Sequence, residues 1–189
     1  IYPLWGRYPD FISRDTLKLF KMLQNLGNEL LLSIEQYSPD EIKSRYTEPL
    51  NQMAEQSSQN LMRIIHYPPI RLSDHPDAIR AGAHTDINLI TALVSGSQPG
   101  LQVKNKSGEW VDIKSKKGQI VINIGDMLQE ASSGYFPSTV HRVINPKELN
   151  NESRYSIPLF IHPRPEVILS SKHTADSYLL ERLKEIGLK

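Results

Sequence analysis

The sequence predicts a mainly β domain with flanking helices, an α+β arrangement rather than an alternating βαβ fold. Helical periodicity is found in the N-terminal third and again near the C-terminus. Between these regions, residues 60–170 form a series of short β-prone runs separated by Gly, Pro, Asn and Ser. Short strands with such frequent turn signals are typical of an antiparallel sandwich or barrel.

The N-terminal third is predicted to be helical. Residues 13–36 carry apolar side chains at helical spacing, and Ser13 is a suitable N-cap. A second helix is expected to start at Ser38, with Pro39 in the first helical position and Glu41 completing a capping box. We expect these helices to be scaffold. The apolar residues of the first helix are Leu17, Phe20, Leu23, Leu26, Leu30, Leu31 and Ile34.

The central region supplies the expected strands and one short helix at residues 127–131. A closing helix is expected at residues 175–186, because its apolar residues share one face and Gly187 stands just past its end. The expected strands lie at residues 61–67, 87–94, 101–104, 110–113, 119–124, 140–144, 155–161 and 167–169.

The length of 189 residues is enough for one compact domain with a sizeable core. We expect residues 1–59 to pack on the barrel as a helical segment and residues 60–170 to form the barrel itself. Residues 171–189 are expected to add the final helix.

The composition argues against several classes of function. Lys and Arg total 22 and Asp and Glu total 21, so the net charge of +1 gives no electrostatic argument for a nucleic-acid or anionic-membrane surface. The chain has no Cys, which excludes disulfides, thiolate zinc sites, iron–sulfur clusters and cysteine nucleophiles. No apolar run is long enough to cross a bilayer and no signal-peptide pattern opens the sequence, so we expect no membrane partner and a cytoplasmic location.

The tetrapeptide Ala83-His84-Thr85-Asp86 is the strongest candidate for a metal site. On a strand or at the end of one, the period of two places His84 and Asp86 on the same side, where an imidazole and a carboxylate can bind one ion. His141, from another strand, is the candidate third ligand. Two His and one carboxylate form the facial ligand set of non-haem Fe(II) oxygenases, which leaves adjacent positions for an organic acid and O2.

Two further segments carry candidate ligands for an organic acid. Arg154 and Ser156 are two residues apart and share one face of the predicted strand. The planar guanidinium matches a carboxylate bidentately and Ser adds a hydroxyl donor, so this pair can hold the remote end of a dicarboxylate. Tyr67, just before Pro68, is a candidate to donate its phenolic hydroxyl to the same acid.

Taken together, these segments resemble the isopenicillin N synthase-like branch of the Fe(II)/2-oxoglutarate-dependent dioxygenases. They occur in the order that is typical of the family, between residues 60 and 161. The matching segments are His66-Tyr67-Pro68-Pro69, His84-Thr85-Asp86, Pro99-Gly100-Leu101-Gln102-Val103, Gly108-Glu109-Trp110, Asn123-Ile124-Gly125-Asp126-Met127-Leu128, Ser138-Thr139-Val140-His141-Arg142-Val143 and Arg154-Tyr155-Ser156.

The resemblance implies a double-stranded β-helix (jelly roll) with helices packed around it. It implies Fe(II) at the three ligands named above, which are the catalytic residues, with O2 and the co-substrate 2-oxoglutarate at the metal. Arg154 and Ser156 would bind the C5 carboxylate of 2-oxoglutarate, and Tyr67 would lie beside the co-substrate or substrate. The implied reaction couples oxidative decarboxylation of 2-oxoglutarate to hydroxylation, desaturation or cyclisation of a small organic substrate, with ascorbate as an accessory reductant.

The sequence departs from the family pattern in two places. Ile65 stands where many plant members carry Asn two residues before the motif Tyr, so a contact from that position is lost. The chain also opens at Ile1 in what resembles the middle of the family pattern, so we expect part of the family's N-terminal segment to be missing.

Two alternative functions remain open from the sequence. The first is an oxidase with the same three metal ligands, in which Arg154 and Ser156 hold a substrate carboxylate instead of 2-oxoglutarate. The second is a catalytically inactive jelly roll that binds a ligand or partner without redox chemistry.

Overall fold

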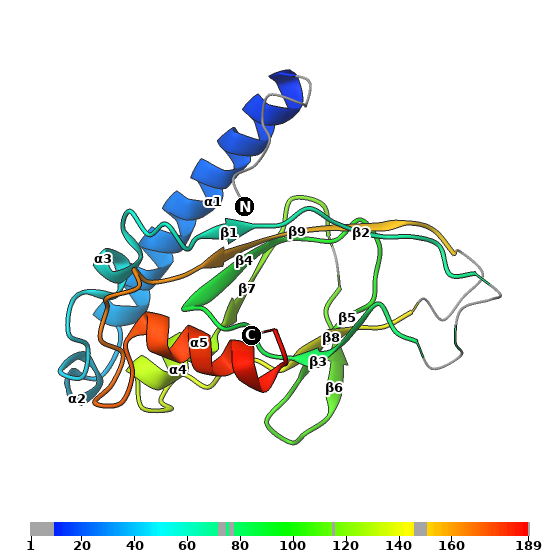
Figure 1. Ribbon diagram of the computed structural model, residues 1–189. Helices are drawn as coiled ribbons and strands as arrows, with labels where there is room; N and C mark the ends of the chain where they lie inside the picture. Colours follow the sequence, from blue (N-terminus) through cyan, green and yellow to red (C-terminus); the bar gives the residue numbers. More distant parts are fainter. Residues whose placement is uncertain (1–9, 72–74, 76–77, 115, 146–150, 189) are drawn as a thin grey trace.

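The computed structural model describes residues 10–71, 75, 78–114, 116–145 and 151–188 (Figure 1). No helix in this part of the chain combines the length and the apolar content that crossing a bilayer requires. In chain order, the elements are α1 (Asp10–Gln36), α2 (Asp40–Lys43), α3 (Leu50–Ala54), β1 (Leu61–Met62), β2 (Ile65–Tyr67), β3 (Ala81–His84), β4 (Ile90–Val94), β5 (Leu101–Lys104), β6 (Trp110–Asp112), β7 (Ile120–Ile124), α4 (Asp126–Ala131), β8 (His141–Val143), β9 (Arg154–Ile161) and α5 (Ala175–Glu185).

The strands form two antiparallel sheets that face each other (Figure 1). One sheet has the strand order β1-β9-β4-β7, with β2 also paired to β9, and the other has the order β3-β8-β5-β6. Neighbouring strands in both sheets are mostly distant in the sequence, as in a double-stranded β-helix. The predicted mainly β jelly roll with flanking helices is confirmed.

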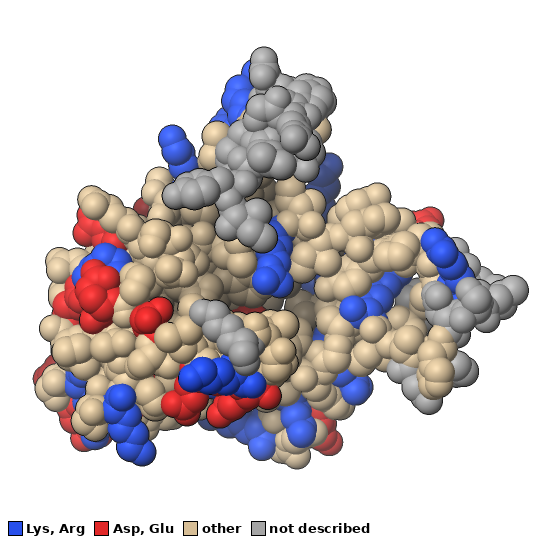
Figure 2. All heavy atoms as spheres, viewed as in Figure 1, with Lys and Arg blue, Asp and Glu red and all other residues tan. Residues whose placement is uncertain are grey.

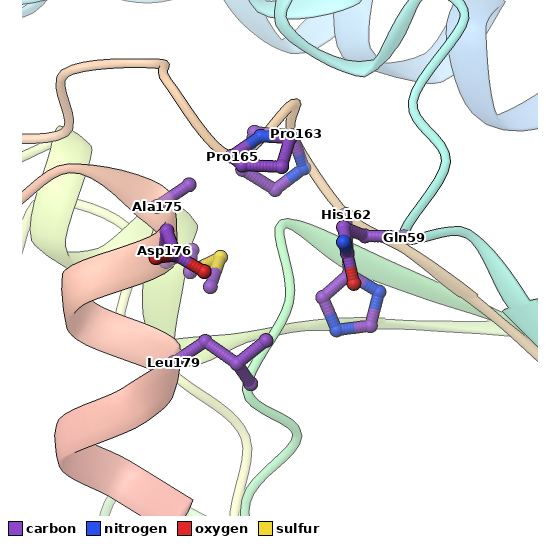
Figure 3. A pocket seen from close by; sticks show the side chains of 8 residues that line it. Gln59, His162, Pro163, Pro165, Ala175, Asp176 and Leu179 are labelled. Carbon is purple, nitrogen blue, oxygen red and sulfur yellow. The ribbon is translucent and has the colours of Figure 1, made fainter.

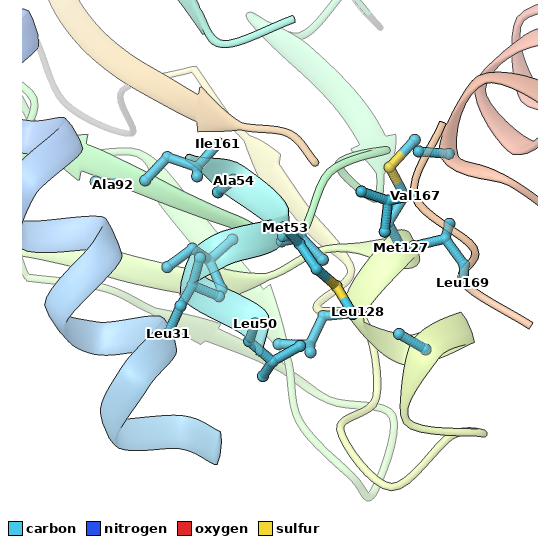
Figure 4. Packing of buried hydrophobic residues seen from close by; sticks show 14 of the residues in the cluster. Leu31, Leu50, Met53, Ala54, Ala92, Met127, Leu128, Ile161, Val167 and Leu169 are labelled. Carbon is cyan, nitrogen blue, oxygen red and sulfur yellow. The ribbon is translucent and has the colours of Figure 1, made fainter. Parts of the chain in front are cut away.

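The two faces of strand β4 have different surroundings. Ile90 and Ala92 are fully buried in the large apolar core, whereas Thr91 and Leu93 line a cavity between the sheets. Strand β9 alternates in the same way, as the period of two requires. The large core therefore lies outside the barrel, between one sheet and the helices α1, α3 and α4 (Figure 4). The barrel interior is left for the site.

Helix α1 packs very closely on strand β9 at Gly27. A Cβ atom at this position would lie 2.0 Å from Cδ1 of Ile161, so only a residue without a side chain allows the present approach of helix and strand. The C-terminal part of α1 covers the sheet, whereas its N-terminal part extends away from the body (Figure 1).

The predicted start of the second helix is wrong in its details. Helix α2 has only four residues, and its N-cap is Pro39, which makes no side-chain cap. The hydroxyl of Ser38 instead donates to the carbonyl of Ile34, 2.7 Å away, because Ser38 still lies at the end of α1. Helix α3 was not predicted.

The strand predictions differ from the structure in three places. The run 61–67 is split into β1 and β2, because Pro158 of the partner strand β9 has no N–H to continue the ladder. The run 167–169 is no strand, and only an isolated bridge joins Ile168 to Thr174. Strand β3 was not among the expected runs, although the metal-site argument assumed a strand at His84.

Candidate active site

Three potential metal ligands come together between the two sheets. One ligand atom each of His84, Asp86 and His141 can be chosen so that all three lie within 4.8 Å of one another. Nε2 of His84 is 4.0 Å and Nε2 of His141 is 3.8 Å from Oδ1 of Asp86. The Asp86 and His141 side chains are 5% and 14% exposed and that of His84 is 48% exposed, so the cluster opens to solvent on the His84 side.

Backbone contacts determine which ring nitrogens face the cluster. Nδ1 of His84 lies 2.7 Å from the carbonyl oxygen of Gly82, and Nδ1 of His141 lies 2.9 Å from that of Thr139. A carbonyl only accepts, so each Nδ1 must carry the proton that it donates. Both Nε2 atoms then keep a lone pair that is directed towards the Asp86 carboxylate, which is the tautomer that binds a metal through Nε2.

The buried carboxylate of Asp86 is held by one of its two oxygens. Oδ2 accepts hydrogen bonds from Oγ1 of Thr91 (2.5 Å) and from Nδ2 of Asn123 (2.9 Å). Nδ2 of Asn88 in turn donates to Oγ1 of Thr91, at 2.8 Å. These bonds orient the carboxylate and leave Oδ1 facing the two imidazoles, as the outer contacts of a metal ligand do.

Helix α4 holds the turn that contains Asp86. The backbone N–H of Asp126 donates to the Asp86 carbonyl (2.8 Å), and the hydroxyl of Thr85 donates to Oδ2 of Asp126 (3.1 Å). Arg182 of α5 forms an ion pair with the same carboxylate at 3.6 Å. The sequence placed His84 and Asp86 on a strand or at its end, and the structure shows the second case, because β3 ends at His84 and Asp86 lies in the segment that follows. Their side chains converge through these contacts.

The donor set fits a single divalent transition-metal ion. Nε2 of His84, Nε2 of His141 and Oδ1 of Asp86 point into a common space. Among the described residues, none of these three atoms forms a hydrogen bond. Imidazole and carboxylate together suit Fe(II), and three protein ligands on one side leave positions for exogenous ligands.

An open cavity includes this cluster and lies between the two sheets, where the surface is hollowed (Figure 2). Its polar lining includes Tyr67, Arg154 and Ser156, so the structure brings all six predicted site residues to one cavity. The two residues of the Arg154–Ser156 pair are 1% and 6% exposed and lie on the same, inward face of β9. The apolar part of the lining comprises Ile65, Ala81, Leu93, Leu101, Val143, Pro158 and Phe160.

Arg154 is buried with an incomplete set of partners. Its Nε donates to the carbonyl of Gln98 at 3.1 Å, but its buried Nη1 has no hydrogen-bond partner among the described residues. Burial is the main cause that lowers the pKa of Arg154. The guanidinium lies over the ring of Tyr67, 5.4 Å from the ring centroid, and against Gly96, where a Cβ would be 2.5 Å from Nη2. A buried guanidinium with an unused donor is suited to an incoming carboxylate.

Sequence reasoning missed several residues that support the site. Asn123 was named only as part of a segment that matches the family, and Thr91 was not singled out. Thr91 lies on β4 and Asn123 on β7, and both side chains line the cavity. A polar residue at a position where the strand is otherwise apolar was the only feature of the sequence that could have indicated their role. Gly96 and Gln98, which surround Arg154, carry no signal in the sequence alone.

A second, smaller pocket lies between α5 and the chain that follows β9 (Figure 3). It is lined by His162, Pro163, Asp176 and Leu179, among others, and by none of the six predicted site residues. Burial lowers the pKa of His162, so this side chain is neutral near pH 7.

Comparison with known proteins agrees with this geometry. The sequence profile of the 2OG-Fe(II) oxygenase superfamily matches residues 58–163, which is more than half of the chain. The chain belongs to this superfamily. The predicted resemblance to Fe(II)/2-oxoglutarate-dependent enzymes is thereby confirmed, and the isopenicillin N synthase-like branch is consistent with it.

The relatives of this chain match different fractions of its length. A Shewanella oneidensis protein assigned as an oxygenase is 55% identical, with a TM-score of 0.89, and the match covers 100% of this chain and 70% of that chain. A Neurospora crassa protein, solved with alpha-KG and thymine, is 26% identical, with a TM-score of 0.74 and coverage of 92% and 56%. The 2-oxoglutarate-dependent dioxygenase citB of Monascus ruber is 37% identical over 102 residues, 52% of this chain and 30% of that protein. The chain therefore spans only about a third of the length of such curated relatives.

Proposed function

We propose that this chain provides the catalytic centre of an Fe(II)- and 2-oxoglutarate-dependent oxygenase that acts on a small organic molecule. The reaction would consume a C–H bond of the substrate, 2-oxoglutarate and O2, and give the hydroxylated product, succinate and CO2. One atom of O2 enters succinate and the other enters the product. Desaturation and cyclisation are variants of the same oxidation.

One observation carries this proposal. One cavity contains three candidate metal-ligand atoms that form no hydrogen bond with any other described residue. The same cavity contains the buried guanidinium of Arg154, whose Nη1 has no hydrogen-bond partner among these residues. A 2-oxo diacid has two matching ends, a keto acid that chelates a metal and a carboxylate that pairs with Arg. We infer that His84, Asp86 and His141 hold Fe(II), and that Arg154 and Ser156 bind the C5 carboxylate, with Tyr67 beside it.

The chain's own residues position and desolvate the reactants. When bound, Fe(II) supplies the oxidative chemistry that amino-acid side chains lack. The backbone carbonyls behind the two His residues fix their tautomer, and Thr91 and Asn123 keep the Asp86 carboxylate aimed at the metal. The apolar walls around Leu93, Leu101 and Val143 keep water from the co-substrate, which strengthens its ion pair with Arg154.

The direct test is succinate formation. The purified chain is incubated aerobically with Fe(II), ascorbate, 2-oxoglutarate and a panel of small organic molecules, and succinate and product are measured. We expect substrate-stimulated succinate formation that is lost in the Asp86→Ala variant, whereas His66→Ala, on the outside of the barrel, retains it. Absence of succinate together with absence of iron binding would contradict the proposal.

A second measurement separates the two alternatives. Calorimetric titration of 2-oxoglutarate into metal-loaded protein is compared with the same titration of Arg154→Ala. Binding that depends on Arg154 supports the 2-oxoglutarate enzyme. Metal binding without affinity for 2-oxoglutarate would instead favour the oxidase in which Arg154 holds a substrate carboxylate. If the wild-type chain binds neither a metal ion nor 2-oxoglutarate, the result would favour the inactive binding domain.

The remaining expectations are also proposals. Thymine accompanies alpha-KG in the structure of the related Neurospora crassa protein, which supports a small-molecule substrate of this general size for the present chain. The cytoplasmic location and the division into segments 1–59, 60–170 and 171–189 remain predictions from the sequence.

A further inference from the structure

A second guanidinium lies near one end of the same cavity. Arg80 directly precedes strand β3, whose first residue, Ala81, lines the cavity. Its Nη2 donates to the carbonyl of Glu152 at 2.8 Å, only two residues before Arg154. Arg80 thus joins the start of β3 in one sheet to the start of β9 in the other.

The position along β3 places Arg80 away from the metal cluster. Four residues separate Arg80 from His84, which corresponds to about 13 Å of extended chain. Arg154 is the first residue of β9, opposite Tyr67 of β2 in the strand register. Arg154 and Tyr67 line the cavity, and Arg80 adjoins its lining residue Ala81 at the end of β3 that is distant from His84. A distal carboxylate that pairs with Arg154 would therefore lie on the side of the cavity that faces Arg80.

Both guanidinium groups have buried N–H groups to spare. Nε of Arg80 and Nη1 of Arg154 are buried and have no hydrogen-bond partner among the described residues. Within the same part of the chain, neither side chain forms an ion pair with a carboxylate, and the carboxylate of Glu152 accepts from Gln98 instead. A buried guanidinium N–H without an acceptor costs free energy, which a bound carboxylate would recover.

The two charges also influence each other. Burial is the main cause that lowers the pKa of Arg80 and of Arg154, and the charge of Arg80 lowers that of Arg154 further, while Tyr67 opposes the shift in both. Like charges that influence each other are unfavourable in a low-dielectric interior, and a bound anion between them would relieve this repulsion.

We infer that Arg80 is a second binding residue for the distal carboxylate of the co-substrate, which it contacts together with Arg154. This inference rests on the proposed function, because it takes 2-oxoglutarate as the ligand. Two guanidinium groups on one carboxylate make the site selective for 2-oxo diacids over 2-oxo monoacids of equal length. Arg80 is not one of the three metal ligands and does not touch the reacting carbon atoms, so its role is in affinity and selectivity.

The test compares two ligands that differ only in the distal carboxylate. Zn(II)-loaded protein, which cannot turn over, is titrated calorimetrically with 2-oxoglutarate and with 2-oxopentanoate. For Arg80→Gln we expect the Kd for 2-oxoglutarate to rise on the order of ten- to a hundredfold, the range for a hydrogen bond to a charged group, while that for 2-oxopentanoate is unchanged. Arg14→Gln, which removes an exposed guanidinium from α1, should leave both values unchanged.

Each outcome decides between binding and structural roles. An equal loss for both ligands would show that Arg80 only supports the fold around Glu152, and an unchanged Kd for 2-oxoglutarate would overturn the inference outright. If wild-type protein binds Zn(II) but not 2-oxoglutarate, the proposed function fails first and the inference fails with it. A selective loss in Arg80→Gln against a tight wild-type complex supports both.

A measurement on the wild-type chain covers the case in which Arg80→Gln does not fold. In Zn(II)-loaded protein labelled with 15N-arginine, the Nε–H resonance of Arg80 is assigned with the Arg80→Lys variant. We expect it to shift on addition of 2-oxoglutarate and to stay in place with 2-oxopentanoate. An identical response to the two ligands, or no response to either while 2-oxoglutarate binds, would refute a direct contact.

Discussion

His84 and His141 are directly opposite each other in the antiparallel pairing of β3 with β8, although they are far apart in the sequence. Their ring centroids are 4.3 Å apart, and both Nε2 atoms approach the same oxygen of Asp86. The strand register therefore brings together two of the three candidate metal ligands. This relationship makes metal binding sensitive to either side chain and leads to the first prediction.

Metal binding should stabilise the folded chain through these ligands. At a Zn(II) concentration of about 100 times the Kd, the free energy of unfolding should rise by about 2.7 kcal/mol, because only the folded chain presents the assembled site. Thermal or denaturant unfolding of His141→Ala should show no such rise, whereas His66→Ala, whose side chain contacts Ser153 outside the cavity, should behave like wild type. Equal stabilisation of His141→Ala would refute the ligand assignment.

The hydroxyl of Thr91 should control metal affinity without contacting the metal. Thr91→Val removes the 2.5 Å hydrogen bond to Oδ2 of Asp86 and keeps the side-chain shape, so the carboxylate loses one of its two orienting contacts. We expect metal affinity to fall by about 10- to 100-fold, as is typical for such outer contacts. Thr47→Val, which removes a hydroxyl bonded to the Ile168 carbonyl away from the site, is the matched control. Similar metal affinities in the two variants would argue against this role.

Gly96 should be required for binding of 2-oxoglutarate rather than for metal binding. The Cβ of Gly96→Ala would approach Nη2 of Arg154 to 2.5 Å and Cζ to 2.7 Å, so the guanidinium must move from its present place. We expect the Kd for 2-oxoglutarate to rise about tenfold or more while metal affinity is retained, since a misplaced charge-assisted pair loses about 1.5 kcal/mol or more. Gly82→Ala, where a Cβ meets nothing within 4 Å, is the control for adding a methyl group near the cavity. The prediction fails if both Ala variants bind 2-oxoglutarate equally well.

Gly27 should be needed for packing of α1 despite its low helix propensity. Ala favours a helix interior by about 1 kcal/mol over Gly, but the added Cβ would lie 2.0 Å from Cδ1 of Ile161. We expect Gly27→Ala to destabilise the chain by about 1–3 kcal/mol in denaturant unfolding, the usual cost of overpacking. Ile161→Val removes the clashing Cδ1, so the double variant should be more stable than the sum of the single effects. Strict additivity of the two changes would show that the contact is not the cause.

The side chain of His173 should give pH-dependent stability. Its Nδ1 and Nε2 each lie 3.1 Å from a carboxylate oxygen, of Glu130 and Glu181, so both nitrogens can donate only when the ring is protonated. The hydrogen bond with Glu130 is the main cause that raises the pKa of His173 above its ordinary 6.5. Because the folded-state pKa is raised, this contribution is fully present below pH 6.5 and is lost as the pH rises through the raised value.

The titration of Glu130 limits the stabilisation by the His173–Glu130 pair at low pH. Its pKa is lowered from 4.5, first by the hydroxyl of Ser170 and also by His173, so its share is present above pH 4.5 and is lost as the pH falls through the lowered value. We therefore expect His173→Gln to reduce the free energy of unfolding most between pH 4.5 and 6.5, and much less near pH ~8.5. A destabilisation that is independent of pH would mean that His173 acts through packing against Tyr178 instead.

The sequence predicted those parts of the candidate site that depend on the spacing of residues within one strand. Arg154 and Ser156 lie on one face of β9, as the period of two required, and both are buried in the cavity. His84 and Asp86 were recognised as a pair on a strand or at its end, and in the structure the strand ends at His84. The turn after β3 is set by contacts with α4, and a single sequence does not reveal contacts between such distant segments.

The residues around the site also depend on contacts between distant segments, which the local sequence does not show. Arg80 precedes β3 in a segment without clear periodicity, and its place beside Arg154 depends on the meeting of the two sheets at Glu152. Ser38 has the sequence context of a helix cap, yet its hydroxyl donates back to the carbonyl of Ile34 in the last turn of α1 rather than capping α2. Local propensity competes in both cases with packing energy that only the folded chain makes available.

The sequence by itself determined the secondary-structure class, the shared face of Arg154 and Ser156 on β9, and the identity of six side chains able to bind a metal ion and an organic acid. These properties follow from chain periodicity and from side-chain chemistry, which are local. The tertiary structure alone decided that His141 faces His84, that Thr91 and Asn123 orient Asp86, and that Arg80 donates to the Glu152 carbonyl, two residues before Arg154. Those facts depend on strand register and on close packing between distant segments, where the free energy of the whole fold selects one arrangement among many that the local sequence permits.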